Sequence, residues 1–361
     1  MERRQPLVKL VDIKKEFPGV KALKGVSLEI LPGEVHGLVG ENGAGKSTLI
    51  KIMMGAHTAT SGEIYIDGER QHIHNPQQAK ALGLGAVYQD VTLAPHLTVA
   101  ENFFLGCQPR KGGLVDWKTM YRSVQKTLDE LNIRVSAKAQ INELTIGQQE
   151  MVTIAKVVYQ NAKVIVFDEP TALLANEEVQ LLFNMIGQLR EKGYGIVYIS
   201  HRMEEIFELC DRVTVIKDGT YVDTVKTSDV CEDKLVQMMV GRDVEDLYNL
   251  QRPDMGECVL EVNGLTRKGS FENISFSVHR GEIFGMFGLV GAGRTEVCRA
   301  IFGADPYEAG EVTILGKSVH HRHPMEAIEN SIAFLTEDRK KEGLCLGLSV
   351  EKNVNLASYP M

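Results

Sequence analysis

Short apolar runs alternate with longer amphipathic stretches along the chain, a pattern that predicts an α/β fold. The run EVHGLVG (34–40) predicts a strand, and KSTLIKIMMG (46–55) begins a helix soon after it. KVIVFDEP (163–170) is apolar without interruption until two carboxylates end it. Such a run predicts a strand of a parallel sheet that is buried on both faces. The stretch 194–219 predicts a strand, an amphipathic helix and a further strand.

A capped helix is predicted over LTIGQQEMVTIAKVV (144–158). Thr145 can cap it, Gln148 follows three residues later, and an apolar stripe continues at Met151, Ile154, Ala155 and Val158. A core helix explains this pattern. An anion site explains it equally, because a hydroxyl and a glycine N–H at a helix N-terminus attract negative charge.

The chain contains a tandem repeat. PGEVHGLVGENGAGKSTL (32–49) aligns with RGEIFGMFGLVGAGRTEV (280–297), and the alignment continues until Gln89 meets Glu337. A matched stretch of this length indicates a duplicated domain. We expect a first copy over 1–243, a polar linker over 244–256, and a second copy over 257–361 that lacks any counterpart of 113–243.

Composition restricts the partners. A chain of 361 residues accommodates two domains, and its net charge of −8 gives a nucleic-acid partner no electrostatic support. Its six cysteines are far apart, which argues against a zinc site or a disulfide framework and fits a reducing cytosol. The N-terminus lacks the apolar region of a signal peptide, and no apolar stretch is long enough to cross a membrane. A membrane role would therefore come through a partner.

A glycine-rich loop lies between the first predicted strand and its helix. GENGAGKST (40–48) matches the phosphate-binding pattern G-x-x-x-x-G-K-[ST] in the strand–loop–helix context that the pattern requires. Lys46 would reach the β- and γ-phosphates of a nucleotide, and Ser47 would bind Mg²⁺. The candidate nucleotide-binding residues are Gly40, Glu41, Asn42, Gly43, Ala44, Gly45, Lys46, Ser47 and Thr48.

Two carboxylates follow the apolar run of the later strand, at the end where α/β sheets place ligands. Asp168 suits the coordination shell of Mg²⁺, and Glu169 suits a general base that orients an attacking water. The alternative is an acidic pair that caps the next helix, and the phosphate loop upstream favours catalysis. His201 also follows a strand, where a lone histidine is more often a cap or a packed side chain.

The second copy carries an altered phosphate loop, GLVGAGRTE (288–296). Gly288, Gly293 and Thr295 are in place, but Arg294 replaces the lysine. A planar guanidinium can hold a phosphate and yet place it differently from lysine. Our hypothesis is that this second site binds nucleotide and hydrolyses it poorly.

Together these segments resemble the ATP-binding cassette (ABC) family, and more narrowly the double-cassette ATPase subunits of bacterial ribose-, galactose- and xylose-type importers. The resemblance covers nearly the whole chain and is carried by GENGAGKST, LTIGQQ, VIVFDEPTALL, YISHRMEEIFELCDRVTVIKDG and TEDRKKEGL. It implies an α/β P-loop NTPase fold with a RecA-like parallel sheet, an antiparallel β subdomain and a helical signature subdomain.

The resemblance also implies roles for single residues. Phe17 matches the aromatic that stacks on adenine. Gln89 matches the glutamine that senses Mg²⁺ and the γ-phosphate and contacts the membrane subunit. Thr145, Gly147 and Gln148 match the signature that grips the nucleotide of the opposite cassette.

Glu169 matches the catalytic base of the family, and His201 matches the switch histidine that touches the γ-phosphate. The chain departs from the family elsewhere. Ile146 replaces the first glycine of the usual signature, and its serine is a threonine here, with the hydroxyl retained. Ala175 replaces an aspartate that many cassettes use in communication between sites, and Glu337 replaces the glutamine in copy two.

The implied function is Mg²⁺-dependent ATP hydrolysis that energises import of a monosaccharide, nearest to the ribose type. The implied partners are transmembrane permease subunits, an extracytoplasmic sugar-binding protein that acts indirectly, and a second cassette half or another ATPase chain. The chain would lie peripherally on the cytoplasmic face of the inner membrane. In this family the cassettes do not touch the sugar, so this chain does not select which sugar is carried.

Copy two ends before any counterpart of the signature, the carboxylate strand or the switch histidine. Either the reading frame is shortened, or the missing half comes from another chain. A nucleotide-binding but catalytically inert fragment or regulator is therefore one alternative. A soluble ABC ATPase acting on ribosomes or DNA is another, which the short joint and the acidic pI of about 5.8 disfavour.

Overall fold

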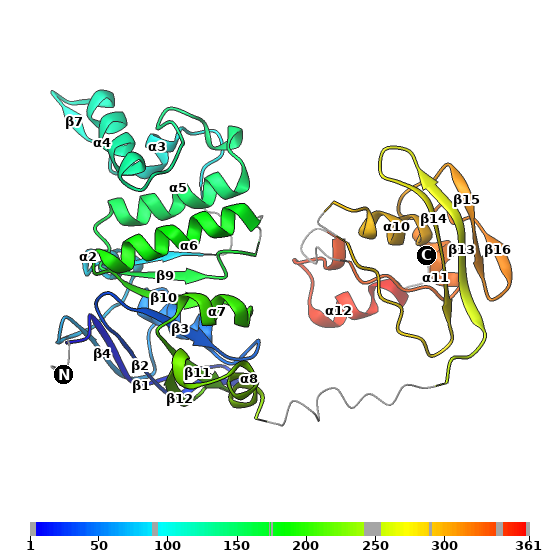
Figure 1. Cartoon of the computed structure of the whole chain (residues 1–361), viewed down its shortest axis with the longest axis horizontal. Helices are drawn as coiled ribbons and strands as arrows, with labels where there is room; N and C mark the ends of the chain where they lie inside the picture. Colours follow the sequence, from blue (N-terminus) through cyan, green and yellow to red (C-terminus); the bar gives the residue numbers. More distant parts are fainter. Residues whose placement is uncertain are drawn as a thin grey trace. The chain divides into compact units, whose positions relative to one another are not determined.

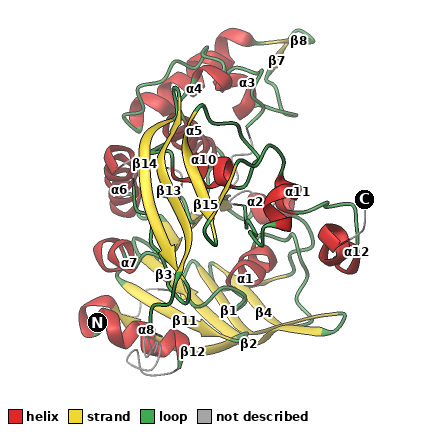
Figure 2. Ribbon diagram, turned by 90° about the vertical axis from the view of Figure 1, so that its right-hand side faces the viewer, coloured by secondary structure: helices red, strands yellow, loops and turns green. Residues whose placement is uncertain are grey.

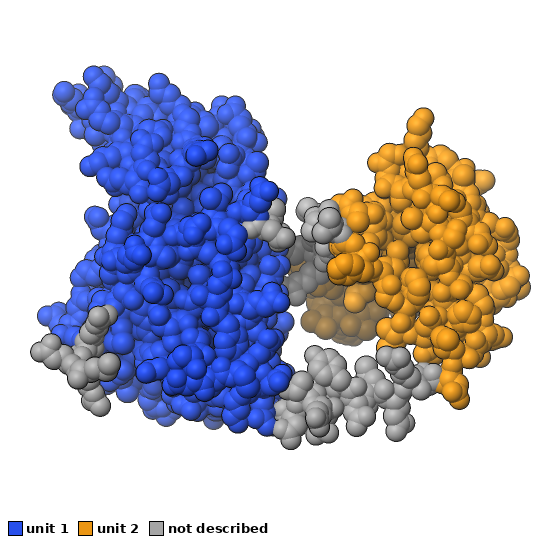
Figure 3. All heavy atoms as spheres, in the orientation of Figure 1, with its two compact units in different colours: residues 1–249 blue, residues 250–361 orange. Residues whose placement is uncertain are grey.

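The computed structural model describes residues 5–88, 93–172, 174, 176–241, 254–288, 291–336 and 342–358. The chain divides into two compact units, 1–249 and 250–361, which Figure 3 colours blue and orange. Most of the expected linker, 244–256, lies outside the described residues, so the expected boundaries at 243 and 257 stay predictions. No helix of the described part is long and apolar enough to cross a membrane.

The centre of unit 1 is a six-stranded sheet in the order β12-β11-β3-β10-β9-β6. Its neighbouring strands are parallel except β11 and β12, which are antiparallel. Every residue of β3 and β10 is buried, and the apolar runs predicted as strands are confirmed as central strands. The bounds are β3 (Val35–Val39), β6 (Leu84–Val87), β9 (Val164–Asp168), β10 (Gly195–Ile199), β11 (Arg212–Lys217) and β12 (Thr220–Lys226).

Both faces of this sheet are covered, so consecutive strand residues enter different cores. Phe167 of β9 packs in a core with side chains of α5, α6 and α7, whereas its neighbour Val166 packs in a second core with α1 (Figure 1). Thr145 caps α5 in a capping box with Gln148, as predicted. The helices are α1 (Lys46–Met53), α2 (Pro76–Ala81), α5 (Ile146–Tyr159), α6 (Asn176–Glu191), α7 (Met203–Leu209) and α8 (Glu232–Val240).

An antiparallel sheet in the order β2-β1-β4-β5 contributes many side chains to the second core. It lies against α1, whose side chains Leu49 and Ile50 are buried (Figure 2). The strands are β1 (Val8–Phe17), β2 (Val20–Ile30), β4 (Ser61–Ile66) and β5 (Glu69–Gln71).

A helical part of unit 1 lies on the face of the central sheet opposite the antiparallel sheet (Figure 1). It consists of α3 (Val99–Phe103), the short strands β7 (Arg110–Lys111) and β8 (Leu114–Val115), α4 (Trp117–Glu130) and the 3₁₀ turn η1 (Ile141–Glu143). Unit 1 thus has the parallel core, antiparallel sheet and helical part that the resemblance implied.

Unit 2 repeats the antiparallel sheet, in the order β14-β13-β15-β16. The segment that aligns with β3 does not form a strand here, and Ile283 and Phe287 are exposed on it. β3 is held by hydrogen bonds to β10 and β11, and the described part of unit 2 has no equivalent of either strand. The elements are β13 (Cys258–Arg267), β14 (Phe271–His279), α10 (Arg294–Ile301), β15 (Ala309–Ile314), β16 (Lys317–Val319), α11 (Pro324–Glu329), α12 (Val350–Asn355) and η4 (Leu356–Ser358).

Candidate nucleotide-binding site

The glycine-rich loop of unit 1 connects the carboxyl end of β3 with the first turn of α1. Gly45 precedes α1 with φ +104°, a left-handed conformation that side chains oppose. A Cβ there would lie 2.7 Å from Cδ2 of Leu23 and 2.8 Å from the carbonyl oxygen of Ala22. The loop therefore requires glycine at this position for both conformation and space.

Lys46 reaches back over the loop. Its ammonium donates hydrogen bonds to the carbonyl oxygens of Gly40 at 2.6 Å and Glu41 at 3.1 Å. Burial lowers the pKa of Lys46, and the nearby Glu169 and Asp168 oppose that effect. Lys46 thus places a positive charge between the loop and the two carboxylates.

A cavity of about 400 Å³ opens beside this loop. Small-molecule sites typically measure roughly 300–1,000 Å³. Its lining includes side chains that the sequence singled out from two separate segments: Asn42, Lys46, Ser47, Thr48, Asp168 and Glu169. Because β3 and β9 are parallel strands of one sheet, their carboxyl ends meet at one edge, where α/β sheets bind ligands.

The two carboxylates differ in their surroundings. Asp168 ends β9, and burial raises its pKa, with the charge of Glu169 adding to the effect and Lys46 opposing it. Glu169 has a φ of +52°, and its N–H donates to the carbonyl oxygen of Ile199 at 2.9 Å. Nδ1 of His201 lies 3.3 Å from Oε1 of Glu169, with side chains 66% and 25% exposed respectively.

Phe17 lies at the end of β1 but is not among the described residues that line the cavity. Its ring packs edge-on against His57, with centroids 5.4 Å apart, and Nζ of Lys15 lies 5.0 Å from the ring centroid. Its hairpin partner Val20 does line the cavity. The adenine-stacking role of Phe17 stays a prediction.

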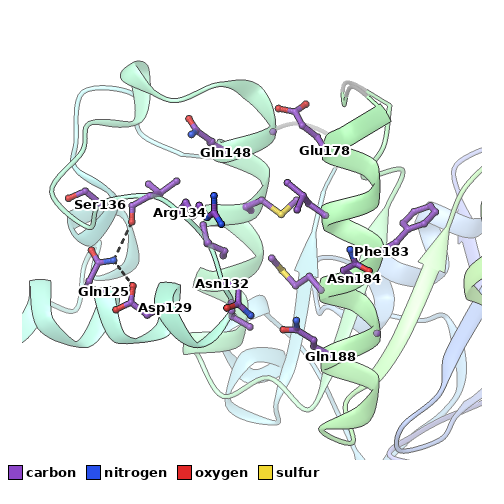
Figure 4. A pocket seen from close by; sticks show the side chains of 18 of the residues that line it. Gln125, Asp129, Asn132, Arg134, Ser136, Gln148, Glu178, Phe183, Asn184 and Gln188 are labelled. Atoms are coloured by element: carbon purple, nitrogen blue, oxygen red, sulfur yellow. Dashed lines mark hydrogen bonds between the residues drawn. The ribbon is translucent and has the colours of Figure 1, made fainter.

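The signature residues lie at the N-terminus of α5, away from this cavity. Gly147 and Gln148 line a different cleft, about 1320 Å³, between α6 on one side and α4 with the following loop on the other (Figure 4). Glu178 of α6 comes close to this helix end, since a Cβ on Gly147 would collide with its carboxylate. The hydroxyl of Thr145 donates to Oε1 of Glu178 at 3.4 Å.

The second glycine-rich loop precedes α10 of unit 2. Gly293 precedes the helix in a left-handed conformation, φ +90°, as Gly45 does in unit 1. Arg294 and Thr295 begin the helix, and the side chain of Arg294 passes close to Gly288. Three further predicted residues, Gln89, Ala175 and Glu337, lie outside the described part of the chain.

One wall of the cavity consists of residues that no sequence motif indicated. The turn between β11 and β12 contributes Asp218 and Gly219, and β2 contributes Lys24. Backbone hydrogen bonds join this turn to the glycine-rich loop and to β2. The N–H of Gly219 donates to the carbonyl oxygen of Ala44 at 3.0 Å, and the N–H of Lys24 donates to the carbonyl oxygen of Gly219 at 2.7 Å. Asp-Gly pairs are typical of turns, but the sequence around Asp218 and Gly219 does not indicate where this turn packs.

A glycine-rich loop between a strand and a helix, facing two carboxylates at the edge of a parallel sheet, defines a P-loop nucleotide-binding domain. A sequence model described as ABC transporter matches residues 23–172 and 271–357. The ribose import ATP-binding protein RbsA 3 of Rubrobacter xylanophilus is 48% identical over 99% of this chain and 72% of its own length. RbsA 1 of Streptomyces avermitilis is 49% identical over 99% of this chain and 68% of its own.

Solved structures of ATP-binding cassettes also match this chain. An ATP-binding cassette of an ABC transporter in its ADP conformation matches 66% of this chain and 99% of its own, with TM-score 0.57 and 26% identity. A dimeric cassette in a post-hydrolysis state, bound to ADP and Pi, matches 61% of this chain and 98% of its own, with TM-score 0.53 and 27% identity. The chain belongs to the ABC transporter family and is an ATPase of that family that uses nucleotide.

Proposed function

We propose that unit 1 binds and hydrolyses Mg·ATP to energise the import of a monosaccharide of the ribose type. The observation that carries this proposal is one cavity lined by Lys46, Ser47, Asp168 and Glu169. The import names of the relatives support the transport role, and they do not favour an inert fragment or a soluble non-transport ATPase.

The phosphate groups would be held by the loop 40–48. Backbone N–H groups at the start of α1 carry partial positive charge, and the ammonium of Lys46 adds a full charge beside them. Phe17 would stack on the adenine from the neighbouring hairpin.

The residues fit a magnesium ion. Ser47 and Asp168 present a hydroxyl and a carboxylate to the same cavity, and Mg²⁺ prefers oxygen ligands. Gln89 would be a further ligand. The ion neutralises charge on the phosphates when it is bound.

Glu169 and His201 would act on the attacking water. A carboxylate at the cavity wall can accept a proton from water at Oε1, and His201 lies 3.3 Å from that atom. His201 would then orient the carboxylate, and the family resemblance implies that it would also touch the terminal phosphate.

Thr145, Gly147 and Gln148 would contact nucleotide held by another cassette. Their position at the N-terminus of α5, outside the cavity of their own unit, supports this role. The dimeric state of a related cassette supports it also. A second cassette half or another ATPase chain would hold the nucleotide that these residues contact.

The second loop, with Gly288, Gly293, Arg294 and Thr295, would bind nucleotide and hydrolyse it poorly. An Arg294→Lys variant should therefore leave transport-coupled turnover within about twofold of the parent. A many-fold gain in turnover would contradict this hypothesis.

The transport partners would be transmembrane permease subunits, served outside by a sugar-binding protein. The chain would dock on the permease from the cytoplasmic face of the inner membrane. Glu337 in place of a glutamine would make the two cassettes contact the permease differently.

The decisive experiment combines binding, hydrolysis and uptake. Calorimetry with ATP and Mg²⁺ should show uptake of nucleotide, and Lys46→Ala should weaken it. Hydrolysis, measured with and without the permease subunits, should be lost in Glu169→Gln while binding is retained. Ribose uptake should require the chain, and full hydrolysis by Glu169→Gln would contradict the proposal.

A further inference from the structure

A buried carboxylate outside the nucleotide cavity joins the two loops that carry Glu169 and His201. Glu205 lies in α7 and is 5% exposed. Three hydroxyls donate to it: Thr171 at 2.7 Å, Tyr198 at 2.9 Å and Ser200 at 2.7 Å. Nη1 of Arg202 also lies 3.4 Å from its Oε1. An ionised carboxylate only accepts hydrogen bonds, so it suits three hydroxyl donors.

Two of these hydroxyls belong to the loops of the candidate catalytic residues. Thr171 follows Glu169 by two positions, and Ser200 directly precedes His201. Both are buried, so their hydroxyls need partners inside the protein. The backbone already links these loops, because Glu169 N–H donates to Ile199 O at 2.9 Å. Glu205 links them again through side chains.

The geometry at Glu169 needs such support. A non-glycine residue with φ of +52° is strained by roughly 1–2 kcal/mol and persists only where its surroundings fix it. His201 is largely exposed, so packing contributes little to its position. The positions of the Glu169 carboxylate and the His201 imidazole therefore depend on how the backbone after β9 and β10 is held, rather than on packing around the two side chains.

We propose that Glu205 is a positioning residue for ATP hydrolysis. By accepting hydrogen bonds from Thr171 and Ser200 on one carboxylate, it fixes Glu169 relative to His201 at the edge of the cavity. The inference deepens the proposed function and rests on it for the roles of those two residues. A misplacement of about 1 Å at a reacting group costs on the order of 100-fold in rate.

A purely structural role for Glu205 makes a different prediction. The hydroxyl of Tyr198 bonds to the same carboxylate but projects from β10 within the core, so its loss releases neither loop. If Glu205 only stabilises the fold, Tyr198→Phe, Thr171→Val and Ser200→Ala should all act through stability. If Glu205 positions the loops, the threonine and serine variants lower kcat and the phenylalanine variant does not.

The experiment uses the full chain with Glu205→Gln, the three hydroxyl variants and Glu204→Gln as the matched control. Glu204 is the exposed neighbour in α7. Glu205→Gln should lower kcat about 10- to 100-fold and leave the Kd for Mg·ATP within about twofold, because the loop 40–48 is untouched. Hydrogen exchange should speed up at 166–172 and 199–203, and stay unchanged at 40–48. Glu204→Gln should match the parent in every measurement.

Two results would overturn the positioning role. One is a kcat for Glu205→Gln, Thr171→Val and Ser200→Ala that falls no further than in Tyr198→Phe. The other is unchanged exchange at both loops. Glu169→Gln, measured in parallel, separates the two proposals. If it abolishes hydrolysis while the Glu205 series keeps kcat, only the positioning role fails; if it hydrolyses normally, the proposed function fails and the positioning role with it.

Discussion

Nδ1 of His201 lies 3.3 Å from Oε1 of Glu169, although the two residues follow different strands of the central sheet. The pairing of β10 with β9 explains their proximity, because Ile199 lies opposite Asp168 in the parallel register. The residues that follow each strand are therefore delivered to the same edge. The strand register and the hydrogen bonds to Glu205 therefore both determine how Glu169 and His201 lie relative to each other.

Replacing His201 should separate catalysis from stability. The imidazole is largely exposed, so His201→Ala should change the free energy of unfolding by less than about 0.5 kcal/mol. Hydrolysis should fall about 100-fold or more, as is typical when a group aiding proton transfer is lost. Paired ATPase and thermal-unfolding assays test this, with the exposed His72→Ala as control. Equal hydrolysis in both variants would remove His201 from the mechanism.

The strands that carry the site could be predicted because local pattern determines them. Short, mainly apolar runs predicted β3, β9 and β10, and the motif spacing placed Lys46 and the two carboxylates at one sheet edge. Pairing between distant segments could not be predicted in the same way. Residues 283–287 do not form a strand because the described part of unit 2 lacks the neighbouring strands that pair with β3 in unit 1. Asp218 lines the cavity because the turn between β11 and β12 packs beside the glycine-rich loop.

Glu205 was missed for a related reason. Its sequence context, MEEIFEL, is that of an ordinary amphipathic helix, and only the fold shows which of its carboxylates is buried. Hydrogen bonds from residues on two other loops cannot be read from a helix period.

Glu150 should make stability fall as pH rises. This carboxyl lies buried in α5, its Oε1 has no hydrogen-bond partner among the described residues, and burial raises its pKa from 4.5 to about 7. The folded state therefore favours the protonated form. The associated stability is complete below pH 4.5 and is lost as pH rises through 7.

A Glu150→Gln variant should remove this dependence. Above pH 7 it should be more stable than the parent by roughly 2–3 kcal/mol, and near pH 4 the difference should vanish. Urea unfolding at several pH values measures the effect. If the variant and the parent differed in free energy of unfolding by the same amount at pH 4 and pH 8, the Glu150 carboxyl would not titrate as proposed.

Glu34 should have the opposite pH dependence. Burial tends to raise its pKa, but hydrogen bonds from His36 and Arg212 outweigh burial and lower it from 4.5 to about 2. Nε of Arg212 donates to Oε1 at 2.6 Å, and Nη2 donates to Oε2 at 3.0 Å. The stability from this pair is present above pH 4.5 and is lost as pH falls towards 2.

Glu34→Gln should lower the free energy of unfolding at pH 7 by about 2–3 kcal/mol. The penalty should shrink as the pH falls from 4.5 to 2, because the parent then loses the same charge. Glu29→Gln, an exposed neighbour paired only with Lys9 among the described residues, is the control and should change stability by less than about 1 kcal/mol. A constant penalty across this range would contradict the low pKa.

Two glycines of the phosphate loop separate conformational strain from steric collision. Both have positive φ, +87° at Gly43 and +104° at Gly45. A Cβ on Gly43 would meet nothing within 4 Å, whereas one on Gly45 would lie 2.7 Å from Leu23 and 2.8 Å from the backbone of Ala22. Gly43→Ala should therefore cost about 1–2 kcal/mol from strain alone, and Gly45→Ala clearly more. Since Gly45 directly precedes α1, Gly45→Ala should also weaken Mg·ATP binding more strongly than Gly43→Ala, as calorimetry would show. Equal losses in the two variants would mean that backbone strain, and not the contact between this loop and β2, limits the shape of the site.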